Sequence, residues 1–164
     1  MNNNKGFSLV ELIIVIAIMA ILVGVMAPQL IKYIEKTNVS SDTQLCDTVK
    51  TAVTTAAMDP EVLNDSTSVT KINNCSAAKP ITFLSGTSKF ESSVAEALGV
   101  SSITAATVNS QLKSSGAQSH GVSFQIVGSN SVHVWIANTD NRGKKGATGW
   151  VNSLGANSNW IYVD

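Results

Sequence analysis

Charged residues are scarce in this sequence. Asp, Glu, Lys and Arg make up 13% of its 164 residues, about half the share in an average globular protein. The 11 basic and 11 acidic side chains balance, so no net charge attracts nucleic acid or an anionic membrane surface over a long range. A protein surface with so few charges repels copies of itself only weakly. This property suits a subunit that packs against its own kind, although many inert extracellular domains have it too.

Residue patterns that build catalytic and metal sites are also missing. The two histidines, His120 and His133, have no Asp or Glu at metal-ligand spacing, and no Cys-x-x-Cys pair occurs. We find no glycine-rich phosphate loop and no nucleophile elbow. The sequence therefore predicts no enzyme, no metal site and no cofactor, and we interpret both histidines as surface residues.

Long apolar runs are absent from most of the chain, with one exception near its N-terminus. Every residue from Leu12 to Ala27 is apolar, and Leu30 and Ile31 extend the run. The span from Phe7 to Ile31 is close to the ~20 residues with which a helix crosses a bilayer. This segment prefers lipid or an equally dry partner, whereas the rest of the chain prefers water.

Three interpretations of this segment compete. A cleavable secretory signal has a shorter apolar core followed by an Ala-x-Ala-like site, and no such site follows here. A plain membrane anchor fits the hydropathy, with Lys5 as the positive side chain before the span. It leaves Glu11 unexplained, because a carboxylate in the membrane costs roughly 2.5–3.5 kcal/mol at the helix centre and less near its end. Such an acid indicates a functional site and needs a partner.

The third interpretation rests on the segment from Lys5 to Ile13, which reads KGFSLVELI. A polar leader ends in Gly6, Phe7 opens the apolar helix, and Glu11 is its fifth residue. This closely resembles the type IV prepilin signature. The resemblance implies that a prepilin peptidase cleaves between Gly6 and Phe7 on the cytoplasmic side and methylates the Phe7 amine. It also implies that Glu11 neutralises the N-terminal amine of a neighbouring subunit, which would fix the register of the two helices because neither buried charge is tolerable alone.

Pro28 is a second match to this family. It is the twenty-second residue after the predicted cleavage site, where many pilins have a proline that loosens the helix. A proline removes one helical hydrogen bond, and Gly24, one turn earlier, weakens the helix further. The resemblance implies that this stretch can unwind when the subunit leaves the membrane. The alternative is that membrane helices simply carry Gly and Pro more often than soluble ones.

The helical pattern continues beyond the apolar run. Apolar residues recur there at spacings of three and four, with Asp, Thr, Gln and Lys between them; they are Val39, Leu45, Cys46, Val49, Val53 and Ala56 or Ala57. We expect one helix from about Phe7 to Met58, ending before Asp59-Pro60 and about 75 Å long. The predicted divisions are a leader over 1–6, a transmembrane and assembly helix over 7–33, an amphipathic continuation over 34–59, and a globular head over 60–164.

The first part of the head is predicted to be mostly irregular. The polar stretch from Glu61 to Lys79 is interpreted as a connection with at most short regular pieces. Ser88 and Glu91 have the spacing of a capping box that opens a short helix closed by Gly99. A second short helix over 103–112 is predicted, with a loop as the alternative.

Strands are predicted for the last part of the head. Apolar and polar residues alternate over 122–126 and 132–136, with a tight turn over 128–131 between them, and 160–163 forms a third strand. The predicted fold class is α+β: a long N-terminal helix packed on a small antiparallel sheet, which is the pilin fold.

Two further features leave alternatives open. A disulfide between Cys46 and Cys75 would tie the helix to the loop after it, and the alternative is a buried thiol at Cys46 and a free one at Cys75. The family often has a cysteine pair near the C-terminus, so this placement departs from its pattern. The basic cluster over 142–146 could contact DNA or could be a solvated loop.

Taken together, the sequence predicts the structural subunit of a type IV pilus. The precursor is expected in the cytoplasmic membrane with its N-terminus inside, and the product in a surface filament made of copies of itself. Its expected partners are the prepilin peptidase and the membrane assembly machinery, and the sequence does not decide between adhesion, twitching motility, aggregation and DNA capture as its use. The alternative is a major pseudopilin of a type II secretion or DNA-uptake system. Those often carry a calcium loop, for which Asp140 and Asp164, the only acids after Glu96, are few.

Overall fold

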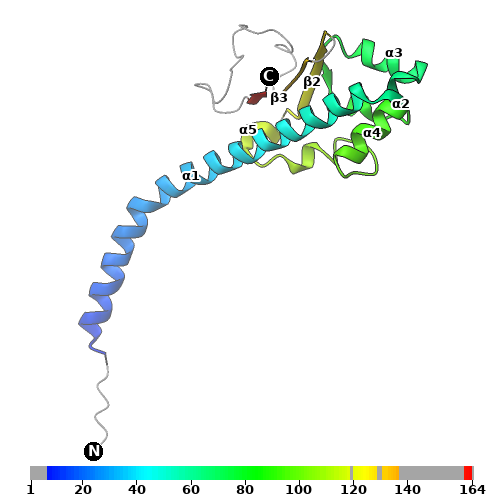
Figure 1. Cartoon of the computed structure of the whole chain (residues 1–164). Coiled ribbons are helices and arrows are strands. Elements are labelled where there is room, and N and C mark those ends of the chain that lie inside the picture. The colour runs from blue at the N-terminus through cyan, green and yellow to red at the C-terminus, as the bar shows by residue number, and fades with distance from the viewer. Residues whose placement is uncertain (1–6, 119, 129–130, 137–160, 164) are drawn as a thin grey trace, which may run out of the picture. The chain divides into compact units, whose positions relative to one another are not determined.

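A computed structural model describes residues 7–118, 120–128, 131–136 and 161–163 of the chain (Figure 1). Its longest element is α1, a helix of 50 residues over Leu9–Met58. The expected long helix is confirmed, and it starts two residues later than expected. It stops at the residue before Asp59-Pro60, as expected from the poor fit of a pre-proline residue to helical geometry.

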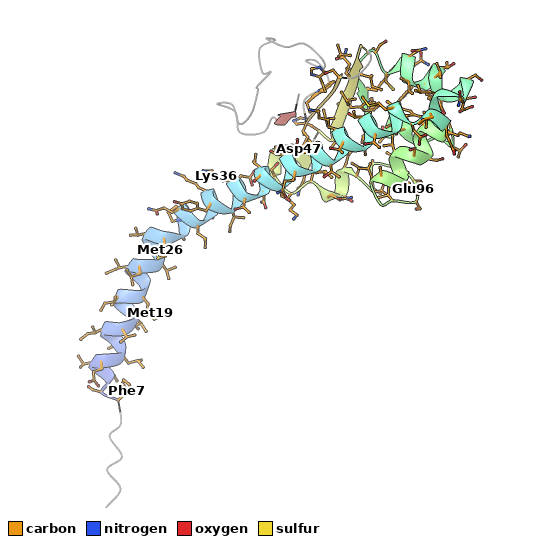
Figure 2. All side chains as sticks on the ribbon, viewed as in Figure 1. Phe7, Met19, Met26, Lys36, Asp47 and Glu96 are labelled. Atoms are coloured by element: carbon orange, nitrogen blue, oxygen red, sulfur yellow. The ribbon has the colours of Figure 1, made fainter. Side chains whose placement is uncertain are left out.

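The chain divides into two units, residues 1–36 and 37–164. In the described part of the first unit, the large apolar side chains of α1 are all exposed. Figure 2 shows those of Met19 and Met26 standing out from the helix, and Phe7 just before its start. Within the described residues, α1 is the one helix whose length and composition would allow it to cross a membrane.

The second unit contains a four-stranded antiparallel sheet. Its strands are β1 (Lys79–Pro80), β2 (Val122–Val127), β3 (Ser131–Ile136) and β4 (Ile161–Val163), and they neighbour each other in that order. The three predicted strands are confirmed, and Gly128 enters the turn between β2 and β3 with a φ of 67°. The short edge strand β1 was not predicted, since two residues are too few to show alternation.

The outer edge of β2 is covered by three separate segments. The Val122 amide donates to Oδ1 of Asn109 at 3.0 Å, Phe124 pairs with Lys79, and the Ile126 amide donates to the Cys75 carbonyl at 2.9 Å. These bonds satisfy backbone groups that an uncovered edge would present to other chains.

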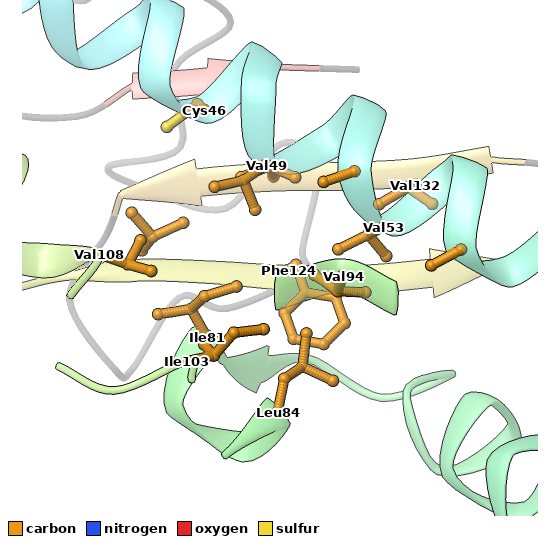
Figure 3. Close-up of a cluster of buried hydrophobic side chains, with 14 of the residues drawn as sticks. Cys46, Val49, Val53, Ile81, Leu84, Val94, Ile103, Val108, Phe124 and Val132 are labelled. Carbon is orange, nitrogen blue, oxygen red and sulfur yellow. The ribbon is translucent and has the colours of Figure 1, made fainter. Parts of the chain in front are cut away.

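The core of this unit lies between the second half of α1 and the sheet. Figure 3 shows Cys46, Val49 and Val53 of α1 pointing toward β2 and β3, with Phe124 on the facing strand. The predicted apolar stripe is confirmed in its main part, because its fully buried members include Val39, Cys46, Val49, Val53 and Ala56. The alternation on β2 and β3 is less strict than predicted, since Trp135, expected on the opposite face, is also buried.

The connection after α1 is more regular than predicted. It forms α2 (Pro60–Leu63) and α3 (Ser66–Asn74), which contact each other and α4 (Lys89–Ala97). Asp65, in the polar stretch that we interpreted as a connection, is a helix cap that accepts from the Ser68 amide, and Asp59, expected only to end α1, also caps α2 by accepting from the Glu61 amide. Asp and Asn favour turns and N-caps alike, and composition alone did not separate the two.

The predicted helix over 103–112 is wrong, whereas the alternative of a loop with turns is right. This segment holds only a short 3₁₀ turn, η2 (Asn109–Gln111), and α5 (Ser115–Gln118) follows it. Thr104 and Thr107 exchange bonds between side-chain oxygens and backbone amides at 2.8 and 3.1 Å. Such bonds compete with the helical ladder.

Candidate assembly site at the helix N-terminus

Glu11 lies in the first turn of α1, close to the backbone of the same chain. The Ser8 amide donates to Oε2 of Glu11 at 2.9 Å, and α1 begins at the next residue, Leu9. Ser8 and Glu11 thus make one half of a capping box, in which a glutamate three residues into the helix binds the amide at the cap position. We predicted a function for Glu11 but missed this bond, although the Ser-x-x-Glu spacing signals it.

The position suits a negative charge. The first turn of a helix has unsatisfied amide groups and the positive end of the helix dipole, so a carboxylate there is stabilised. A carboxylate can accept about four hydrogen bonds, and the Ser8 amide uses one of them. Glu11 can therefore bind a cation from another molecule and keep its hydrogen bond with the Ser8 amide.

The surroundings of Glu11 are apolar and open. Phe7 is 88% exposed, Leu9 73% and Val10 61%. A partner that covers these side chains would also remove water from the carboxylate and strengthen its attraction to a cation. Gly6 and the rest of the predicted leader lie outside the described residues.

The predicted helix-loosening residues are both inside α1. The helix runs through Gly24 and Pro28 without interruption. Among the residues that the structure describes, none would meet a Cβ at Gly24 within 4 Å, so contacts with them do not require glycine there. Loosening of this stretch stays a prediction.

Asp42 is a buried acid that we did not predict. It lies on the apolar stripe of α1 and is 0% exposed. Its Oδ1 accepts from the Lys113 amide and its Oδ2 from the Ser114 amide, both at 2.8 Å. We placed the acids of this helix on its solvent side. Its spacing indicates the buried face, since Asp42 is three residues after Val39 and four before Cys46.

Glu91 joins α3 to α4. It completes the predicted capping box with Ser88, which is confirmed, and it forms an ion pair with Lys71 at 2.6 Å. Burial alone would raise the pKa of Glu91, but bonds from Lys71 and Ser88 together hold it below its ordinary value. Lys71 also lies 4.6 Å from the centre of the Phe83 ring. These contacts are structural, and they fix the helices at one end of the second unit.

Both cysteines are buried and are free thiols in the structure. Burial, followed by the nearby Asp42 and Asp47, raises the pKa of Cys46. Burial raises the pKa of Cys75 to about 11, although Lys79 and Lys71 oppose the shift. Thiols of this kind are poor nucleophiles near neutral pH. The disulfide between Cys46 and Cys75 stays a prediction.

The remaining candidate residues do not gather into a site. His120 is exposed, and His133 is half-buried with its Nε2 3.2 Å from Oγ of Ser131. Within the described part of the chain, no three His, Cys, Asp or Glu side chains come together as a metal site would require. The basic cluster over 142–146 and Asp140 lie outside the described residues.

Comparison with known proteins bears on the N-terminal segment. A family model described as the prokaryotic N-terminal methylation motif matches residues 1–27. These residues carry a type IV prepilin signal. The resemblance that we drew from Gly6, Phe7 and Glu11 is therefore confirmed, and the matched segment includes the capped start of α1.

A curated relative gives a second likeness. A fimbrial protein of Moraxella nonliquefaciens is 46% identical over 55 residues, which are 34% of this chain and 36% of that protein. The chain thus matches little more than a third of its relative's length. No solved structure matches the chain significantly. The prepilin motif and the α+β fold with its long helix are shown, while the activity of the whole protein is a matter for proposal.

Proposed function

We propose that this chain is a type IV pilin, a structural subunit that is held in the membrane and polymerises through α1. One observation carries the proposal: the methylation motif over residues 1–27 coincides with the start of a long helix, α1, in whose apolar first part, before Lys32, Glu11 is the only charged residue. The likeness to a fimbrial protein supports it. On this proposal the chain is structural and has no catalytic role.

Processing would begin at the leader. The prepilin peptidase cleaves between Gly6 and Phe7 and methylates the new amine of Phe7. Cleavage removes Lys5 and creates an ammonium at the start of a segment with no other charge than Glu11 before Lys32. In a dry environment each of these two charges needs an opposite one close by.

Assembly would bury the apolar half of α1. The large apolar side chains from Phe7 to Ile34 are all at least 50% exposed in the isolated chain. Burying one such side chain fully contributes about 1.5–3 kcal/mol, so the segment is stable only in lipid or against other copies. Transfer from membrane to filament exchanges one dry environment for another, and the pairing of Glu11 with the neighbour's Phe7 amine would then fix the register.

Several partners and locations follow from this proposal. The precursor would span the cytoplasmic membrane with its N-terminus inside, where the peptidase and the assembly machinery act. The product would be a surface filament of many copies of the chain. A pseudopilin shares the motif and the processing, and it differs in where its fibre is found.

Mass spectrometry of sheared surface filaments tests the proposal. We expect the chain to be recovered from them starting at N-methylated Phe7. Recovery of methylated Phe7 from the membrane alone, together with a loss of protein secretion or DNA uptake on deletion, would support the pseudopilin instead. A chain that keeps Met1 and stays in the membrane would overturn both.

A further inference from the structure

Four side chains line a shallow hollow on α1 just after the apolar run. They are Gln29, Lys32, Tyr33 and Lys36, which we call the interfacial patch. All four are exposed, Tyr33 by 68%, and Figure 2 shows Lys36 standing out from the helix. The hollow has a volume of about 240 Å³ and is open to solvent.

Helical geometry places the patch on one face. Its members are spaced by three, four and seven residues, which stack on one side of a helix with 3.6 residues per turn. The opposite side carries the exposed apolar residues Leu30, Ile31 and Ile34. The segment after Pro28 is therefore amphipathic, unlike the apolar segment before it.

The distance along the helix puts the patch at a membrane surface. Leu9, the first residue of α1, is 23 steps of 1.5 Å, or about 35 Å, from Lys32, and Phe7 lies two residues before the helix. A bilayer has a hydrocarbon core about 30 Å thick and measures about 40–45 Å with its headgroup regions. When Phe7 lies near one face of the core, Lys32 and Tyr33 reach the headgroups of the other. Tyr and Lys are the side chains that anchor helices there.

We propose that the interfacial patch binds the headgroup of an anionic phospholipid at the end of the span away from the N-terminus. The Lys32 and Lys36 ammonium groups, one turn apart, would contact one phosphate, with the Tyr33 ring at the boundary to the acyl chains. The nearest acid, Glu35, lies about 110° around the helix axis from the centre of the patch. Because the whole chain has no net charge, this attraction is local. The inference rests on the proposed membrane-held precursor.

Lipid titration followed by native mass spectrometry tests this proposal. The full processed chain in detergent is titrated with phosphatidylglycerol and with phosphatidylcholine. We expect tighter binding of the anionic lipid, and about a fivefold loss of its affinity for each lysine removed in Lys32→Gln and Lys36→Gln. The control, Lys89→Gln with Lys113→Gln, makes the same change in charge elsewhere and should keep the preference. Inorganic phosphate should not displace the lipid.

The outcomes separate this inference from the proposed function. Equal affinity for the two lipids, or an unchanged preference in the double variant at Lys32 and Lys36, overturns the patch. A double variant that keeps its lipid affinity but shifts in oligomer size would show an interface between copies instead. If carbonate extracts the unaltered chain from cell membranes, the membrane-held precursor itself is wrong.

Discussion

Replacing Asp42 should destabilise the second unit more than replacing any exposed acid. Its carboxylate is fully buried and accepts two backbone amides, from Lys113 and Ser114, that are far away in the sequence. Asp42→Asn keeps one carbonyl oxygen and turns an NH₂ group toward the other amide. One of the two backbone amides, that of Lys113 or that of Ser114, then loses its acceptor and faces another hydrogen-bond donor.

The size of the effect follows from these contacts. A buried polar group left without its partner costs about 1–3 kcal/mol, and bonds to a charged group are worth about 1.5–3 kcal/mol. We therefore expect Asp42→Asn to lower the free energy of unfolding by about 3 kcal/mol. Small domains have about 5–15 kcal/mol in total, so this variant should still fold.

Urea unfolding of the processed chain in detergent measures the loss. Fluorescence of the buried Trp135 is one probe of the second unit. At a urea m-value of about 1.5 kcal/mol per M, the midpoint should fall by about 2 M in Asp42→Asn. Asp47→Asn, on the exposed side of the same helix, is the control and should shift it little. Equal midpoints for the two variants would refute the structural role of Asp42.

Three further predictions concern the second unit. The folded pKa of Glu91 is lowered, so its contribution to stability is complete above the unfolded pKa of about 4.5 and is lost as pH falls through the folded value. Glu91→Gln should therefore make the free energy of unfolding depend less on pH across that acid range. A pH dependence equal to that of the unaltered chain would contradict this. Cys46 and Cys75 should resist iodoacetamide at pH 8 when folded and react in guanidinium, whereas a bridged pair would react only after reduction. Gly121→Ala should lower the midpoint in thermal unfolding by several degrees, because φ is +73° and the new Cβ would lie 2.6 Å from the side-chain Nδ2 of Asn109. An unchanged midpoint would contradict both the backbone strain and the clash.

The elements with strong local patterns were predictable from the sequence. The helix α1 has an unbroken apolar run and then a stripe at helical spacing, and Asp59-Pro60 ends it. The strands β2 and β3 alternate around a glycine turn. The predictions were wrong where the local signal is ambiguous. Asp65 is equally compatible with a turn and with a helix cap, and threonines such as Thr104 and Thr107 occur in helices and in loops.

The buried polar contacts were less predictable, because their partners are distant in the sequence. Asp42 binds amides about 70 residues away, and no spacing rule connects them. Glu91 was predicted as a cap through Ser88, three residues away, but its ion pair with Lys71 spans 20 residues. Periodicity locates the stripe on which Asp42 lies, while only the packed fold shows what covers it.

Glu11 caps the helix locally, and on the proposed function it would also pair with a neighbouring subunit; the energies of these two roles differ enough to be separated by experiment. A cap at a helix N-terminus is worth about 0.5–2 kcal/mol. Leaving one partner of a buried ion pair uncompensated costs about 3–5 kcal/mol. Glutamine keeps an oxygen that can accept the Ser8 amide but cannot neutralise an ammonium, whereas alanine does neither.

We therefore expect Glu11→Gln and Glu11→Ala to be cleaved and inserted in the membrane, and both to yield few filaments. Glu35→Gln, in the same unit but beyond the apolar run, should assemble like the unaltered chain. Mass spectrometry of the membrane fraction reports cleavage, and the amount of sheared filament reports assembly. If Glu11→Gln assembled normally while Glu11→Ala failed, the cap alone would explain the residue, because a neutral side chain cannot balance the neighbour's amine in a dry interface.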